Sequence, residues 1–261
     1  MNDVGSLLHA AALGLSTSVA IATLAWAASV PRRDVSIVDS VWSLLVLAPA
    51  GVALLVLPQP GPRATVVLLL AALWAVRLAV YITWRHWGHD EDPRYREIRA
   101  RNGPHFVWKS LYLVFGLQAL LGWVVSMPLV GAVTSDVPWG WLDALGCALF
   151  AFGIVVEALA DGQLAGFRAN PSNRGRVMAE GLWRYSRHPN YFGEFCVWWG
   201  LWLVALSAGA WWSVVSPLLM TVLLLKVSGV TLLEKDIGER RPAYRAYVAR
   251  TNAFFPWRPR A

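Results

Sequence analysis

Long apolar runs separated by short polar segments dominate this chain. Seven runs reach the roughly 20 residues that a helix needs to cross the hydrocarbon core of a bilayer. They cover residues 6–27, 37–57, 64–84, 106–130, 139–160, 189–208 and 210–232. Backbone groups in lipid must pair within their own segment, and no outer-membrane strand alternation is present, so each run predicts a transmembrane helix. The pattern therefore predicts an all-α polytopic membrane protein, one seven-helix domain over residues 1–261.

The cations are distributed unevenly between the two sides of the predicted membrane domain. Alternating the loops places 20 of the 23 Lys and Arg residues on one side. Arg63 alone lies on the other side, and Arg77 and Lys226 lie within spans. Because basic residues collect in cytoplasmic loops, the N-terminus is expected outside and the C-terminus in the cytoplasm.

Several ionisable residues fall within or at the ends of the predicted spans. They are Asp39, Arg77, Glu157, Asp161, Glu194 and Lys226. Each is costly against lipid, so they are expected to face one another or a wet cavity, and such residues mark function. The alternative for one pair, Arg77 with Asp39, is a buried structural ion pair.

The third span presents a possible catalytic face. Trp74, Arg77 and Tyr81 follow helical spacing, with Arg85 one turn beyond. A phenol beside a carboxylate can donate a hydrogen bond to a substrate carbonyl and stabilise the negative charge that develops there. Taken alone, Tyr81 is more typical of an aromatic at the membrane interface.

The stretch 161–194 concentrates the polar chemistry of the chain. It contains five arginines and ends in RHPNYFGE, which leads into the sixth span. Pro189 suits the first turn of that helix, where free N–H groups beside arginines favour phosphate. Asn190 and Glu194 lie one turn apart on one face. Residues 161–188 are therefore predicted to form a cytoplasmic cofactor loop, although single arginines could instead anchor the protein to acidic lipid headgroups.

Two further polar segments are expected on the cytoplasmic side. Residues 233–261 form a basic tail in which Tyr244 and Tyr247 share one helical face and arginines the other, as in an amphipathic helix at the membrane surface. The loop RHWGHDEDPRYREIRARNG predicts another surface helix. Its histidines are not spaced with acids as metal ligands are, so no metal is predicted.

Composition narrows the class of protein further. With 57% hydrophobic residues and 16 tryptophans, the chain is too apolar for a soluble domain. The net charge of +7 follows from the cytoplasmic loops and does not require nucleic acid. Both cysteines lie in predicted spans, which disfavours a disulfide framework. Neither G-x-G-x-x-G nor G-x-x-x-x-G-K-[ST] occurs, so a nucleotide would bind between helices and their loops.

The sequence GLWRYSRHPNYFGE, preceded by GFRANP and followed by E-x(9)-Y-x-x-Y-x(7)-F-P, resembles the membrane steroid 5α-reductase family, in particular its bacterial branch. The resemblance covers residues 140–261 well and 35–100 loosely. The RHPNY core is shared with isoprenylcysteine carboxyl methyltransferases. The FRANP element and Trp183 instead resemble the corresponding positions of the reductases, including the sterol C14-reductases.

This resemblance implies NADPH-dependent reduction of a 3-oxo-Δ4 steroid or a similar lipophilic enone that enters from the bilayer. It also implies a multi-pass protein of the bacterial inner membrane, expected to act as a monomer among membrane lipids. The family polarises the ketone with a glutamate on the second helix and a tyrosine on the third. Here Asp39 is the nearest acid and Trp74 takes the place of the tyrosine, with Tyr81 two turns on. The candidate catalytic residues are therefore Asp39, Trp74, Arg77 and Tyr81.

Cofactor contacts transfer by position onto Asp161, Arg168, Trp183, Asn190 and Glu194, with Arg168 at the phosphates and Asn190 at the nicotinamide. The full candidate set adds neighbouring polar residues and two tail positions where the family has a histidine and a tyrosine: Asn170, Asn173, Arg174, Tyr185, His188, Tyr191, Asp236 and Arg240. Two alternatives remain, an S-adenosylmethionine-dependent methyltransferase and a membrane protein without chemistry. Three phosphate groups on NADPH, against none on S-adenosylmethionine, fit the arginines better.

Overall fold

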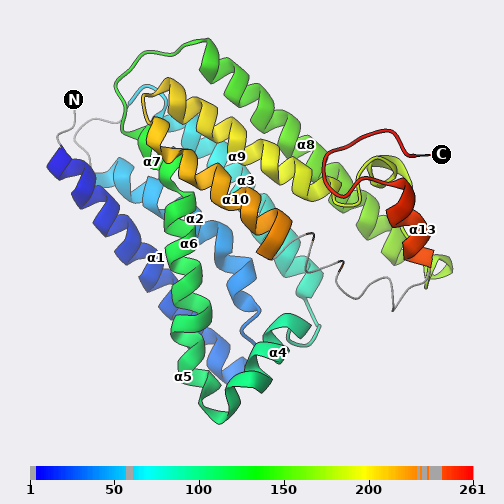
Figure 1. Cartoon of the computed structure of the whole chain (residues 1–261). Coiled ribbons are helices and arrows are strands. Elements are labelled where there is room, and N and C mark those ends of the chain that lie inside the picture. Colours follow the sequence, from blue (N-terminus) through cyan, green and yellow to red (C-terminus); the bar gives the residue numbers. More distant parts are fainter. Residues whose placement is uncertain (1–3, 57–60, 228–229, 231–233, 235–242, 261) are drawn as a thin grey trace. The chain divides into compact units, whose positions relative to one another are not determined.

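The computed structural model describes residues 4–56, 61–227, 230, 234 and 243–260. Within these residues the protein is helical and contains no strand, as the apolar pattern predicts (Figure 1). The chain divides into two compact units, each of which is described by itself. Unit 1 comprises Met1–Gly140 and Ala205–Ser213, and unit 2 comprises Trp141–Val204 and Val214–Ala261.

Unit 1 is organised around its second helix. Its helical segments are α1 (Val4–Arg32), α2 (Ile37–Val56), α3 (Ala64–His86), α4 (Pro93–Asn102), η1 (Gly103–His105), α5 (Phe106–Ser110), the π-helical turn η2 (Leu111–Gly116), α6 (Leu117–Val125) and α7 (Met127–Val133). Helix α2 packs against α1, α3, α6 and α7. Hydroxyls tie these helices together, because Ser18 donates to the carbonyl of Leu45 and Ser43 to that of Ala75.

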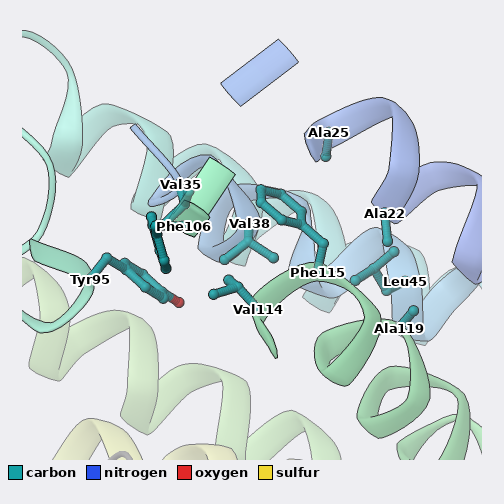
Figure 2. Close-up of a cluster of buried hydrophobic side chains, with 10 residues drawn as sticks. All are labelled: Ala22, Ala25, Val35, Val38, Leu45, Tyr95, Phe106, Val114, Phe115 and Ala119. Carbon is teal, nitrogen blue, oxygen red and sulfur yellow. The ribbon is translucent and has the colours of Figure 1, made fainter. Parts of the chain in front are cut away.

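A buried apolar cluster within unit 1 joins residues of α1, α2, α4, α5, η2 and α6 (Figure 2). Val38 and Leu45 of α2 are fully buried there, and α4 contributes Tyr95. Helix α4 begins at Pro93, with Asp92 as its cap accepting from the Arg94 amide. The helix expected in the RHWGHDEDPRYREIRARNG segment is thus confirmed, and one of its residues reaches the core.

Five described helical stretches are long and apolar enough to cross a membrane: Leu7–Arg32, Ile37–Val56, Ala64–His86, Pro93–Val125 and Trp141–Ala169. They correspond to the first five predicted spans and support a helical integral membrane protein. The sixth prediction coincides with α9 (Pro189–Ser207), whose 19 residues begin with polar side chains. The seventh overlaps a shorter apolar stretch, Trp211–Val227. Seven spans therefore remain a prediction.

The predicted single helix over 106–130 is wrong in detail. It is interrupted at Ser126, and the separate helix α7 starts at Met127. Pro128 explains the start of α7, because proline has no N–H to donate and suits a first helical turn.

Unit 2 contains the polar stretch identified in the sequence. Its segments are α8 (Trp141–Ala169), the 3₁₀ turns η3 (Pro171–Asn173) and η4 (Gly181–Arg184), α9 as far as Val204, α10 (Val215–Val222), the π-helical turn η6 (Leu223–Val227) and α13 (Ala243–Arg250). The predicted loop over 161–188 needs correction, because α8 continues through Ala169. Asp161 and Arg168 therefore lie on a helix. In α13, Tyr244 and Tyr247 are buried and Arg245 and Arg250 exposed, which confirms the amphipathic pattern.

Candidate functional site: a polar seam between two glycine-packed helices

Helices α8 and α9 approach each other through glycines spaced seven residues apart on each helix. A Cβ atom added to Gly153 would lie 2.6 Å from the carbonyl oxygen of Gly193. One added to Gly200 would lie 2.6 Å from the backbone nitrogen of Phe150. No side chain fits in such gaps, so glycine is needed for the backbones to meet.

Polar side chains lie along the same contact, towards the start of α9. We call Glu157, Asp161, Asn190 and Glu194 the polar seam. The three acids are 4%, 5% and 6% exposed. Asn190 Nδ2 donates to Asp161 Oδ1 at 3.1 Å, and the Trp198 indole donates to Glu194 Oε1 at 2.9 Å. The structure thus brings together Asp161 and Asn190, which lie 29 residues apart in the chain.

The segment before α9 is fixed against α8 by Trp183. The Trp183 indole donates to the carbonyl oxygen of Ala160 at 3.0 Å, directly beside Asp161. Gly181 precedes it with a positive φ of 58°, and a Cβ there would meet Gln163 Oε1 at 2.6 Å. The same oxygen accepts from the Leu182 amide. A glycine at 181 is therefore required to place Trp183 against the seam.

Arg168, the predicted phosphate contact, lies in the last turn of α8, and Arg174, a further predicted cofactor contact, follows η3. Arg168 and Arg174 are exposed. Asn170 and Asn173 shape the turn between them: Asn170 accepts from the Ser172 amide at 3.0 Å, and Asn173 donates to the Phe167 carbonyl at 3.0 Å. Tyr185 is 43% exposed. This end of unit 2 therefore presents cations on a turn held by its own amides.

Glu234, in the C-terminal segment, binds the first two residues of the RHPNY motif. Arg187 donates to both carboxylate oxygens, at 2.7 and 2.8 Å, and His188 Nε2 lies 2.9 Å from Oε1. Tyr244 also reaches Oε1, at 3.4 Å. We call Arg187, His188, Glu234, Tyr244 and Tyr247 the tail clasp. His188, a predicted cofactor contact, is thus bound to Glu234, and its ring stacks on Tyr191 at 5.5 Å.

Electrostatics and backbone pairing strengthen the tail clasp. Burial raises the pKa of Glu234, but hydrogen bonds from His188 and Arg187 outweigh it, and the pKa falls to about 2. The carboxylate's contribution to stability is therefore present above its ordinary pKa and lost only as pH falls towards 2. Arg187 also donates to the Thr251 carbonyl at 2.5 Å. Tyr247 donates to the carbonyls of Trp183 and Ser186. Asp236 and Arg240, the predicted tail contacts, lie outside the described residues.

The candidate catalytic residues lie in unit 1 and form two groups. On α3, the guanidinium groups of Arg77 and Arg85 lie 5.7 and 5.8 Å from the centre of the Tyr81 ring, which confirms that these residues share a face. Trp74, one turn before Arg77, is fully buried.

Asp39, the predicted acid of the second helix, forms a pair that the sequence did not reveal. Its Oδ1 accepts from the Tyr95 hydroxyl at 2.6 Å, and its Oδ2 binds Arg94 at 2.7 Å. Asp39 thus acquires a phenol partner from α4. Among the described residues, the nearby buried Nδ1 of His86 has no hydrogen-bond partner.

Tyr95 and Glu234 are the main residues that sequence reasoning missed. The start of α4 was signalled by Asp92-Pro93, and its periodicity places Tyr95 opposite the exposed Arg96 and Glu97. Glu234 opens the E-x(9)-Y-x-x-Y motif, but the motif does not show which distant residue its acid binds.

These features describe a helical membrane protein in which buried acids and a half-buried amide line the contact between two helices, one of which ends in an exposed arginine. The chain belongs to the DUF1295 family, described as proteins of unknown function, whose family model matches residues 25–251. It is also 26% identical over 280 residues to "Uncharacterized protein C594.04c" of Schizosaccharomyces pombe (strain 972 / ATCC 24843), covering 94% of this chain and 79% of that protein. No solved structure matches the chain.

Proposed function

We propose that this protein is an NADPH-dependent reductase of the C=C bond of a lipophilic enone, with the 4,5 double bond of a 3-oxo-Δ4 steroid as the model substrate. The observation that carries the proposal is the Asn190–Asp161 pair. An amide that is half-buried beside a buried acid is oriented by it, and retains donor and acceptor capacity for a second amide, such as the carboxamide of nicotinamide.

The cations of unit 2 suit the rest of such a cofactor. Arg168 lies seven residues after Asp161 on α8, about 10 Å along the helix axis. Arg168 and Arg174 are exposed there, and guanidinium groups bind phosphates with strong charge-assisted hydrogen bonds. The residues present therefore fit a phosphorylated dinucleotide: the arginines hold its phosphates, and Asn190 with Glu194 orients its nicotinamide end. Bound NADPH supplies the hydride.

Unit 1, taken by itself, contains phenols of the kind that polarise a carbonyl group. Tyr95 carries a proton directed at Asp39, and Tyr81 lies beside two guanidinium groups. The Tyr95 proton is already donated to Asp39, so Tyr81 is the phenol that can donate to the oxygen on which negative charge develops during reduction. The proposal keeps seven spans with the N-terminus outside, because the arginine-bearing loops then face the cytosol, where NADPH is available.

Purified protein in detergent gives the direct test. We expect NADPH to bind, with Arg168→Ala weakening binding by about 2 kcal/mol because one charge-assisted phosphate contact is lost. The saturated rate of enone-dependent NADPH oxidation should change little. Arg260→Ala, near the exposed end of the chain, is the matched control.

Binding of S-adenosylmethionine without NADPH would instead favour the methyltransferase. Unchanged NADPH affinity in folded Arg168→Ala would assign this arginine to lipid headgroups. Failure to bind either compound would contradict both activities.

A further inference from the structure

The tail clasp reaches two of the residues assigned above to the cofactor. His188 precedes Pro189 and Asn190 directly, and its side chain is held at 2.9 Å by Glu234. The first turn of α9 is therefore oriented from outside the helix by an acid 46 residues further along the chain. A shift of His188 must also move Asn190, because only one residue separates them.

A second branch of the clasp leads to Trp183. Tyr244 contacts Glu234 at 3.4 Å, and its ring lies 5.5 Å from that of Tyr247 in an edge-to-face arrangement. The Tyr247 hydroxyl donates to the carbonyl of Trp183, which lies in η4. The Trp183 indole in turn binds the Ala160 carbonyl beside Asp161.

We propose that Glu234 is a positioning residue that sets the affinity of the polar seam for its ligand through His188 and Trp183. The carboxylate of Glu234 begins both series of contacts. One leads through His188 to Asn190, and the other leads through Tyr244, Tyr247 and Trp183 to the Ala160 carbonyl beside Asp161. Glu234 itself touches neither Asn190 nor Asp161 in the described contacts; it acts through the clasp. This inference rests on the proposed function only in naming the ligand as a nicotinamide dinucleotide.

The charge of Glu234 explains why a neutral side chain cannot replace it. Arg187 is 9% exposed and directs two nitrogens at the carboxylate. A guanidinium so deeply placed needs an ionised partner, since an unpaired buried charge is strongly unfavourable. Glutamine keeps the shape of glutamate but offers one acceptor oxygen in place of two, so Arg187 and His188 compete for it.

The test compares Glu234→Gln with Glu97→Gln in full-length protein. Glu97 pairs with Arg101 on the exposed face of α4 and serves as the control for removal of an ion pair. We expect Glu234→Gln to raise the Kd for NADPH about 10-fold, the effect of losing one charge-assisted hydrogen bond, and to lower kcat as well, because a displaced Asn190 misplaces the nicotinamide. Glu97→Gln should change neither constant.

A second readout requires no cofactor. The indole N–H signal of Trp183 in an NMR spectrum of ¹⁵N-tryptophan-labelled protein is identified by its loss in Trp183→Phe. We expect this signal to shift in Glu234→Gln and to stay in place in Glu97→Gln. If NADPH fails to bind the wild-type protein but the signal shifts, the proposed function fails and the positioning role stands.

Two outcomes would overturn the inference. One is an unmoved Trp183 signal in folded Glu234→Gln. The other is a Glu234→Gln protein with lower thermal stability and the wild-type Kd for NADPH. That result would mean that the tail clasp only holds the C-terminal segment in place.

Discussion

The asparagines of unit 2 show how far one residue type can differ in role. Asn170 and Asn173 bind atoms of their own turn, between residues 167 and 176. Asn190 instead binds an acid on another helix. Sequence spacing singled out Asn190 because it lies four residues before Glu194 on one helical face. It could not show Asp161 as the partner, because that contact depends on how α8 and α9 pack.

Replacement of Asn190 tests the seam directly. We expect Asn190→Ala to fold and to lower the rate of enone-dependent NADPH oxidation about 100-fold at saturating substrates, because a displacement of about 1 Å in hydride transfer has this effect. Asn190→Leu should be at least as harmful, since leucine fills the place of the amide and cannot pair.

Asn102→Ala is the control for this experiment. Asn102 donates to the Ile98 carbonyl at the end of α4, so its loss should affect stability without affecting the rate. A wild-type rate in Asn190→Ala at saturating NADPH and enone would show that the seam is not the site.

At the scale of helices, the contact between α8 and α9 depends on the close approach of their two backbones at the glycines. Gly200→Ala places a Cβ atom against the backbone of Phe150, which cannot rotate away. We expect a loss of about 1–3 kcal/mol in the free energy of unfolding, the range typical of overpacked cores. Thermal or denaturant unfolding in detergent measures it.

Gly162→Ala on α8 provides the matched comparison, because nothing lies within 4 Å of its added Cβ. Alanine in an open helical position should be neutral or slightly stabilising. Equal destabilisation by both substitutions would mean that the helices are not packed through their glycines.

Element boundaries were predictable to different degrees for physical reasons. The start of α9 was recovered at Pro189, because proline at a first turn is a strong local signal. The end of α8 was placed at 160, where the hydropathy falls, but backbone hydrogen bonding continues to Ala169. Loss of apolar character does not end a helix. The tail clasp joins residues more than 40 positions apart, which no local pattern specifies.

At the scale of the molecule, the charge distribution predicts a topology. Arg63, the one cation expected outside, is fully buried and donates to the Pro138 carbonyl at 2.8 Å and to Ser207 Oγ at 3.1 Å. In the predicted topology the exposed cations lie almost entirely on the other side. We expect a C-terminal fusion to green fluorescent protein to fluoresce and one to alkaline phosphatase to be inactive.

Fusions within the Gly61–Pro62 turn and after Trp139 should give the opposite result. Active phosphatase at the C-terminus would invert the orientation and remove the cytosolic supply of NADPH from the arginine-bearing end. The apolar pattern sufficed to predict the helical class and five helices long and apolar enough to cross a membrane, since length and hydropathy decide those. It did not predict the two compact units, because that division depends on tertiary contacts.

The close packing of α8 against α9 also has a consequence for the insertion of the protein into the membrane. Glu157 lies near the middle of α8, and an acid at the centre of a helix inserted alone into lipid costs about 3 kcal/mol. The partner surface that covers it is on α9, which the ribosome completes later. We therefore expect α8 to be held at the translocon until α9 emerges, so that the two enter the bilayer as a hairpin. Substitutions that block their pairing should then reduce the amount of protein delivered to the membrane before any effect on turnover can be measured.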